Sequence, residues 1–472
     1  MIRSLRREWD ARNARTLLNV GVVLAVLALA YLLGKRATPR MAQLAVIGVG
    51  GAIAFVVLTR RPTWGLLALI AASFLVPVEF GTGTKVPLNA TILLVPFLLV
   101  VWLLRMVVVE REIRLVPSRV TAPALAFALA TTVSLVAGNI RWPFFAEPAN
   151  LPAQLGGWAL YVFPMGLLLL VGNQIRDARS LRALTWLFLA LGGLYIAGRI
   201  LPGPGRFSGR LFVEGSTGSM FWTWLVALAF GQFLLNRDLR PRWRLALGLL
   251  TAATLYVGWF QGKEWLSGWV PPLIAIAVII WLRSWRWGLA FTVAAGAFLL
   301  LYHSVLTPQV MTAEQEYSTA SRAATWPIMY ELVKMSPILG LGPSNYNHYT
   351  PLYSLWGWYV KFNSHNNYWD IAAQTGLVGL GLFAWLVAEI GGLGWRLRAR
   401  VRDGFSRGYV AGALGGLVGM LAAGWMGDWF LPFTYNIGVP GFRAALFAWL
   451  FLGGLMALEQ ILPVKGREAG SG

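Results

Sequence analysis

A histidine at the edge of an apolar segment is a first candidate for acid–base chemistry. His365 lies in the polar stretch 364–368 (SHNNY), directly before an apolar run that continues over 369–390. The N-terminus of the helix expected there would lower the pKa of the imidazole and keep it neutral. A neutral imidazole at the membrane–water boundary could act as a general base. The alternative interpretation is a helix cap or an ordinary interfacial residue.

A second candidate is an arginine on a predicted amphipathic helix. Arg322 shares one helical face with Trp326, Met329, Tyr330 and Val333. The pattern predicts a helix that lies on the membrane surface, with Arg322 at its start. The following turn, 337–345 (PILGLGPSN), could present backbone N–H groups to an anion. An ordinary interfacial helix and turn is the alternative.

Further arginines stand in a glycine-rich loop, 205–210 (GRFSGR). The glycines would let the backbone approach a ligand, and the planar guanidinium of Arg206 or Arg210 could bind phosphate oxygens in pairs. The alternative is a flexible loop whose arginines meet lipid headgroups. The sequence has no D-x-D motif and no adjacent acidic pair, so a metal-bound diphosphate lacks its usual carboxylate ligands. We therefore predict no metal and no other cofactor, and expect Arg and Lys to neutralise any phosphorylated substrate.

The composition of the chain indicates whether these residues belong to a soluble or a membrane protein. Of 472 residues, 57% are hydrophobic and 12% are charged, about half the roughly 25% charged residues of soluble domains. This balance argues against a soluble enzyme, a disordered scaffold or a fibrous protein, and indicates a chain largely immersed in lipid. The net charge of +21 fits basic cytoplasmic loops, so we predict no nucleic-acid partner. Cysteine is absent, which excludes disulfides and a cysteine nucleophile.

Apolar runs long enough to cross a bilayer recur along the chain and predict an all-α, polytopic membrane protein with about 12–14 transmembrane helices. With the N-terminus inside, the most basic connections, 236–244 and 393–408, fall on the inner side, as the excess of basic residues in cytoplasmic loops predicts. The short basic loop 35–40 falls on the outer side and is an exception to this rule. The same topology places outside a long polar and aromatic segment that contains all three histidines. Loops of this length are usually functional. We predict N-terminal transmembrane helices over 1–200, transmembrane helices with an arginine-bearing outside loop over 201–302, a large outside loop over 303–366, C-terminal transmembrane helices over 367–462 and a disordered tail over 463–472.

Several motifs follow one another between about residues 200 and 390. They are Ser321-Arg322 with Trp326, the stretch 337–343 (PILGLGP), His365-Asn366 with Tyr368, and 376–380 (GLVGL). In order and spacing this set resembles the signature of the bacterial O-antigen ligase and O-antigen polymerase family. The stretch 427–429 (GDW) and the last span are a looser match, and the N-terminal third matches as hydrophobic spans only.

The resemblance implies a membrane glycosyltransferase of the GT-C type in the bacterial inner membrane, with its active site on the periplasmic face. The implied donor is a glycan on undecaprenyl diphosphate, and the implied acceptor is a hydroxyl of a glycan or of lipid A-core. The family's arginines correspond to Arg206 or Arg210 and to Arg322, and its histidine corresponds to His365.

Two positions depart from the family pattern. Lys263 follows Gly262 where the family often has Ser-Arg, and Gln374 stands where it often has Glu. Lys263 keeps the positive charge but lacks the bidentate geometry of arginine. Its expected role as a fourth cation at the diphosphate, beside Arg206, Arg210 and Arg322, rests on the charge alone.

The implied reaction is an inverting transfer in which an acceptor hydroxyl attacks the anomeric carbon and undecaprenyl diphosphate leaves. The cations would stabilise the leaving group without a metal, and His365 would position or deprotonate the acceptor hydroxyl. The isoprenoid tail is expected in an apolar groove between spans. An enzyme of this kind requires Arg210, Arg322 and His365 to converge on one outside cavity that opens sideways to lipid.

Other functions remain open from the sequence. A ligase and a polymerase of this family differ only in the acceptor, and the motifs do not separate them. A flippase or transporter for lipid-linked glycans is a more distant alternative. Transporters place ionisable groups near the bilayer midplane, whereas the candidate polar groups of this chain gather at one face. A scaffolding membrane protein would not need basic residues and a histidine on that face.

Overall fold

A computed structural model describes residues 61–77, 79–80, 88–140, 146–201, 211–213, 215–310 and 313–462. The chain divides into two compact units, Met1–Pro62 and Thr63–Gly472, and the second is described below. The predicted spans 16–34 and 41–59, the loop with Arg206 and Arg210, and the predicted tail 463–472 lie outside the described residues. The side chains of 302–318, which include His303, also lie outside the description.

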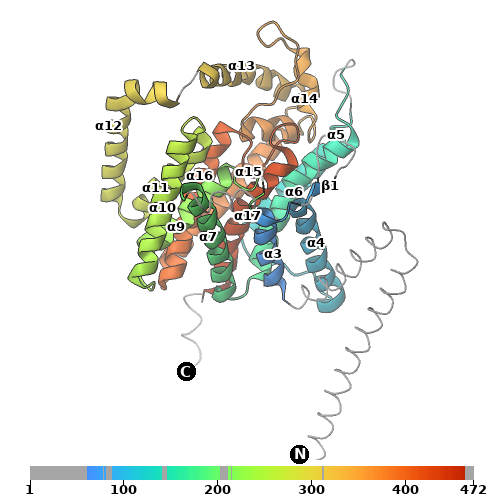
Figure 1. Cartoon of the computed structure of the whole chain (residues 1–472). Coiled ribbons are helices and arrows are strands. Elements are labelled where there is room, and N and C mark those ends of the chain that lie inside the picture. Colours follow the sequence, from blue (N-terminus) through green and yellow to red (C-terminus); the bar gives the residue numbers. More distant parts are fainter. Residues whose placement is uncertain are drawn as a thin grey trace, which may run out of the picture. The chain divides into compact units, whose positions relative to one another are not determined.

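Helices form nearly all of this second unit (Figure 1). In the described part of the chain, eight helices are long and apolar enough to cross a membrane. They are α4 (Ala90–Leu104, continued by the π-helix η1, Arg105–Glu110), α6 (Leu151–Gln174), α7 (Ala178–Ile200), α10 (Pro241–Gly262), α11 (Leu266–Arg283), α15 (Asn367–Arg400), α16 (Gly404–Met426) and α17 (Gly438–Ile461). The shorter apolar helices are α3 (Pro62–Leu75), α5 (Thr121–Ala137) and α9 (Ser219–Leu235). The prediction of an all-α, polytopic membrane protein is confirmed.

The remaining elements connect these helices. Strands β1 (Glu79–Phe80) and β2 (Leu88–Asn89) pair antiparallel between α3 and α4. The predicted span 285–302 corresponds to α12 (Trp285–Val310), which extends further and is not among the eight. The predicted outside loop contains α13 (Ala313–Met335), the one-turn α14 (Tyr346–Tyr349) and the 3₁₀ turn η2 (Thr350–Leu352).

Helix α17 lies at the centre of the bundle, and its apolar stretch is completely buried. Helices α9 and α16 pack closely against each other beside it. Glycines explain how closely that pair approaches. A side chain at Gly231 of α9 would collide with the backbone of Gly408, and one at Gly412 would lie 2.8 Å from the carbonyl oxygen of Ala227. Small residues at such crossings allow membrane helices to pack through their backbones.

Helix α13 lies across one end of the bundle (Figure 1), and its buried face differs from the predicted stripe. Met329 and Val333 are buried in the protein, whereas Trp326 and Tyr330 are exposed. The buried face instead continues through Thr325, Ile328 and Leu332. Arg322 lies in the middle of the helix rather than at its start, because the polar residues from Ala313 onward already belong to the helix.

The glycine-rich turn after α13 packs against a break in α15. Gly376 has φ 70° and ψ −175°, which interrupts the helix there. The N–H groups of the turn donate to backbone carbonyls: Gly340 to Ser336 (2.9 Å), Leu341 to Ala373 (2.8 Å) and Gly342 to Gln374 (3.1 Å). The expectation that these N–H groups face an anion is therefore wrong, because they join the turn to itself and to α15.

Gln374, the departure from the family pattern, belongs to the same packing. Its Oε1 accepts a hydrogen bond from the N–H of Ser344 (2.8 Å), and its Nε2 donates to Tyr161 Oη (2.8 Å). The side chain is buried. An amide, unlike a carboxylate, supplies both the acceptor and the donor that this position uses.

We expect Gly376→Ala to lower the free energy of unfolding by at least about 2 kcal/mol. The backbone angles at this position are open essentially to glycine alone, and a methyl group would collide with the carbonyl oxygen of Ile338. Thermal unfolding in detergent measures the effect. Gly381→Ala on the same helix is the control, since a Cβ there meets nothing within 4 Å. Equal stability of the two variants would contradict the role of the break.

Candidate functional site

His365 is held in a strained backbone position directly before α15. Its φ is 47°, a left-handed conformation that is uncommon outside glycine. Asn366, not His365, caps the helix: its Oδ1 accepts from the N–H of Tyr368 (2.9 Å) and of Trp369 (3.3 Å). The alternative interpretation of His365 as the helix cap is therefore wrong. Strain of this kind is typical of sites where a side chain must be aimed.

A buried polar network fixes the segment that carries His365. The carboxylate of Asp370 accepts hydrogen bonds from Ser364 Oγ and from Tyr346 Oη, each at 2.6 Å. Tyr346 Oη in turn accepts from the backbone N–H of Ser364 (3.1 Å). These residues are buried, so the network positions the backbone on the N-terminal side of His365.

Side chains from three separate segments meet at His365. Asn436, in the connection between α16 and α17, places its Nδ2 3.3 Å from His365 Nδ1 and donates from the same Nδ2 to Asp428 Oδ1 (2.5 Å). The other oxygen of Asp428 accepts from the N–H of Phe433 (2.7 Å). Arg322 of α13 reaches the same connection and donates from Nη1 to the carbonyl oxygen of Met426 (3.3 Å).

The charges of this cluster act on one another. Burial, and then the Arg322 cation, lower the pKa of His365 to about 4, so the imidazole is neutral at pH 7. The predicted neutral state agrees with this, but its cause is burial and the arginine rather than the helix N-terminus. Burial raises the pKa of Asp428 to about 6. Burial lowers the pKa of Arg322, and the Asp428 carboxylate opposes that effect.

The hydrogen bonds also select one tautomer of His365. Asn436 Nδ2 bears two hydrogens, of which one points to Asp428 and the other to His365 Nδ1. An amide N–H can approach Nδ1 only if that nitrogen carries no proton. The proton of the neutral ring must then be on Nε2, which becomes a donor. This arrangement suits an imidazole that positions an oxygen better than one that removes a proton through Nε2.

The other predicted site residues fall in different places. Lys263 follows α10, its side chain is exposed, and no contact with Arg322 or His365 appears among the described residues. Its neighbour Trp265 packs edge-to-face on Trp429, with centroids 5.5 Å apart. Trp265 and Trp429 help line a cavity of about 490 Å³. Lys263 is therefore two residues from a side chain that packs on Trp429, the neighbour of Asp428, without belonging to the cluster itself. Arg206 and Arg210 lie outside the described residues.

Asp428 and Asn436 were not predicted as site residues. A polar pair in a short connection between two apolar spans is a signal that sequence inspection could have used. What the sequence could not show is that this connection folds back onto His365, more than sixty residues earlier. Among the described residues, no group of three or more His, Asp or Glu side chains is arranged to hold a metal ion.

The fold and this cluster define a class: an all-α, multi-pass membrane protein whose Arg, His, Asp and Asn side chains gather at one end of the bundle. Residues 246–384 match a family model described as O-antigen ligase. This segment includes Lys263, Arg322 and His365, and through it the chain is similar to the O-antigen ligase and polymerase family. The match supports a glycosyltransferase-like activity on lipid-linked glycans at a membrane. No curated protein matches the chain.

Proposed function

We propose that the protein is an inverting, metal-independent glycosyltransferase of the ligase type, in the bacterial inner membrane, with its site on the periplasmic face. It transfers a glycan from undecaprenyl diphosphate to an acceptor hydroxyl of lipid A-core or of another glycan. The match of residues 246–384 to the family model supports the general reaction. The observation that carries the assignment of residues is the meeting of Arg322, His365, Asp428 and Asn436 at one end of the bundle.

In the proposed reaction the acceptor oxygen forms a bond to the anomeric carbon, and the bond from that carbon to the diphosphate oxygen breaks. The diphosphate leaves with the electron pair, and Arg322 stabilises its growing charge. The Nε2–H of His365 donates to the acceptor oxygen and aims it. The acceptor proton is released to water, because the acceptor attacks the face of the sugar opposite the departing diphosphate. Arg206, Arg210 and Lys263 remain proposed as further cations at the diphosphate.

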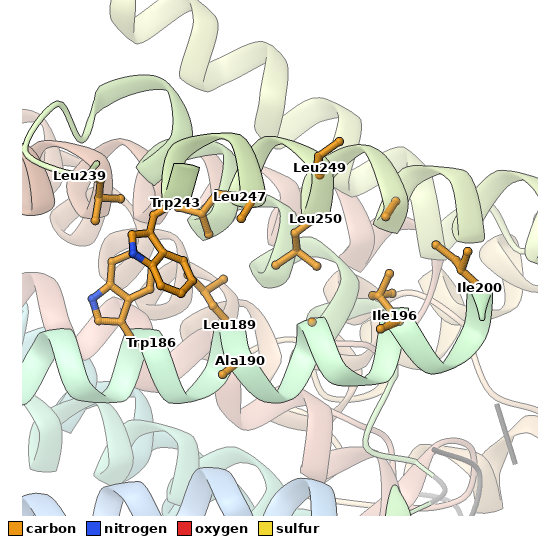
Figure 2. Close-up of a pocket in the computed structure, with 14 residues that line it drawn as sticks. Trp186, Leu189, Ala190, Ile196, Ile200, Leu239, Trp243, Leu247, Leu249 and Leu250 are labelled. Carbon is orange, nitrogen blue, oxygen red and sulfur yellow. The ribbon is translucent and has the colours of Figure 1, made fainter. Parts of the chain in front are cut away.

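The proposed seat of the isoprenoid tail is an apolar groove of about 660 Å³ between α7 and α10 (Figure 2). Trp186 and Trp243 stand at one end, and Ile196 and Ile200 stand towards the other. The lining contains no charged side chain. A groove of this chemistry between two candidate spans accepts a hydrocarbon chain and rejects a headgroup.

We expect Gly193→Trp to raise the KM for a lipid-linked donor roughly tenfold, with kcat little changed. Gly193 lines the groove opposite Leu250, 3.8 Å from the position of an added Cβ, so an indole would fill the space. Gly381→Trp is the matched control, because Gly381 faces open space on α15. The groove assignment fails if both variants retain the wild-type KM.

The function itself is tested with purified protein, a defined undecaprenyl-diphosphate oligosaccharide and EDTA. We offer lipid A-core and a second lipid-linked repeat as separate acceptors and identify the product by mass. Transfer to lipid A-core with inverted anomeric configuration is the expected result. Elongation of the lipid-linked repeat would instead make the protein a polymerase. Loss of activity on chelation, restored by a divalent cation, would refute metal independence.

A further inference from the structure

An aromatic hairpin stands beside the candidate site. Residues 355–358 form a two-residue turn in which Leu355 and Trp358 exchange both backbone hydrogen bonds, at 2.9 and 3.0 Å. The two turn residues, Trp356 and Gly357, have φ angles of 52° and 87°. Positive φ at both positions is typical of a type I′ turn, which normally takes Asn or Gly rather than a tryptophan. A tryptophan in this left-handed conformation is unfavourable, and such strain is typical of functional sites.

The hairpin is anchored at its base and exposed at its tip. Asn347 Nδ2 donates to the carbonyl oxygen of Phe362 (2.7 Å), and Thr350 Oγ1 donates to that of Val360 (3.2 Å). By contrast, the side chain of Trp358 is 72% exposed and that of Tyr359 is 68% exposed. A rigid, exposed group of large aromatic side chains is typical of a binding surface.

Two polar contacts join the residue after the hairpin to the connection that carries Asn436. Lys361 Nζ lies 3.4 Å from His348 Nδ1, and His348 Nε2 lies 3.2 Å from Tyr435 Oη. Tyr435 precedes Asn436, which contacts His365. Donors and acceptors therefore lie between the hairpin and the connection that contacts His365.

The direction of the hairpin decides between two kinds of partner. Exposed Trp and Tyr in a membrane protein often lie at the lipid headgroups. Here the segment after α14 projects beyond α13, away from the spans (Figure 1), which favours a partner on the aqueous side over lipid headgroups. Aromatic faces beside hydroxyl-binding side chains suit sugar rings, which present C–H faces and hydroxyl edges.

We propose that the hairpin 355–360, with Lys361, His348 and Tyr435, is a glycan-binding track that holds the sugar chain on the side remote from the reacting bond. This deepens the proposed function and rests on it. A track of this kind contributes more with a long glycan than with a single repeat, because only a long chain reaches the tip.

The test compares two undecaprenyl-diphosphate donors, one with a single repeat and one with many. We expect the double variant Trp358→Ala/Tyr359→Ala to lower kcat/KM for the long donor roughly tenfold and to leave the short donor unchanged. Trp358→Phe should retain most of the activity, because it keeps an aromatic face. Trp287→Ala is the matched control, since Trp287 on α12 is also 72% exposed.

Equal loss with both donors would overturn the proposal and would indicate a tip that anchors the protein to the bilayer. Unchanged rates with both donors would overturn it as well, while leaving the proposed transferase intact. If the wild-type protein transfers neither glycan, the proposed function fails, and this outcome is distinct from a failure of the track.

Discussion

Arg322→Ala lowers kcat for glycan transfer by about 10²–10³. The guanidinium is the described cation that stands with His365 and Asp428, and its charge opposes the charge that forms on the departing diphosphate. Only Nη1 has a partner at this site, the carbonyl oxygen of Met426, whereas Nε is buried without one in the described structure. The group therefore keeps donor capacity for phosphate oxygens.

Two companion variants separate charge from geometry. Arg322→Lys keeps the charge without the planar fork, and we expect an intermediate rate. Lys334→Ala removes an exposed cation from the same helix, where Lys334 pairs with Glu331 (2.9 Å), and should leave kcat near the wild-type value. Rates are measured with saturating donor. A wild-type kcat for Arg322→Ala would remove this residue from the mechanism.

Asn436→Asp raises the pH at which the enzyme loses activity on acidification. In the wild type, Asp428 takes up a proton at about pH 6, and His365 stays neutral until about pH 4. A carboxylate at position 436 would face Nδ1 and favour the imidazolium, raising the pKa of His365 by roughly 1–3 units. The imidazolium is populated below the pKa of His365, so a higher pKa moves the acid limb that reports this ionisation towards neutral pH.

The readouts are the pH–rate profile and the ¹⁵N signals of the imidazoles, of which the chain has three. Asn436→Leu is the matched control: it removes the hydrogen bond to Nδ1 without adding charge. We expect it to lower the rate without moving the acid limb to higher pH. An unchanged profile in Asn436→Asp would show that the amide does not position His365.

Particular elements show how far the sequence could lead. The motif 337–343 marks the family resemblance, but the prediction that its N–H groups face an anion is wrong. These groups donate to backbone carbonyls of the turn itself and of α15 beside Gly376. Of the predicted stripe on α13, Met329 and Val333 are buried, whereas Trp326 and Tyr330 are exposed. Apolar spacing indicates a helical stripe, but it does not show which of its residues a neighbouring element covers. The sequence predicts a neutral His365, whereas the causes of its lowered pKa, burial and then the Arg322 cation, required the tertiary structure.

The sequence alone determined that this chain is an α-helical membrane protein, because the apolar content and the length of each run are local properties that hydrocarbon selects directly. It also determined which family motifs are present, since these are short and contiguous. Only the tertiary structure decided that Asp428 and Asn436 complete the environment of His365, and which nitrogen of the ring carries the proton. Such contacts join residues far apart in the chain, and no local pattern encodes the helix packing that brings them together.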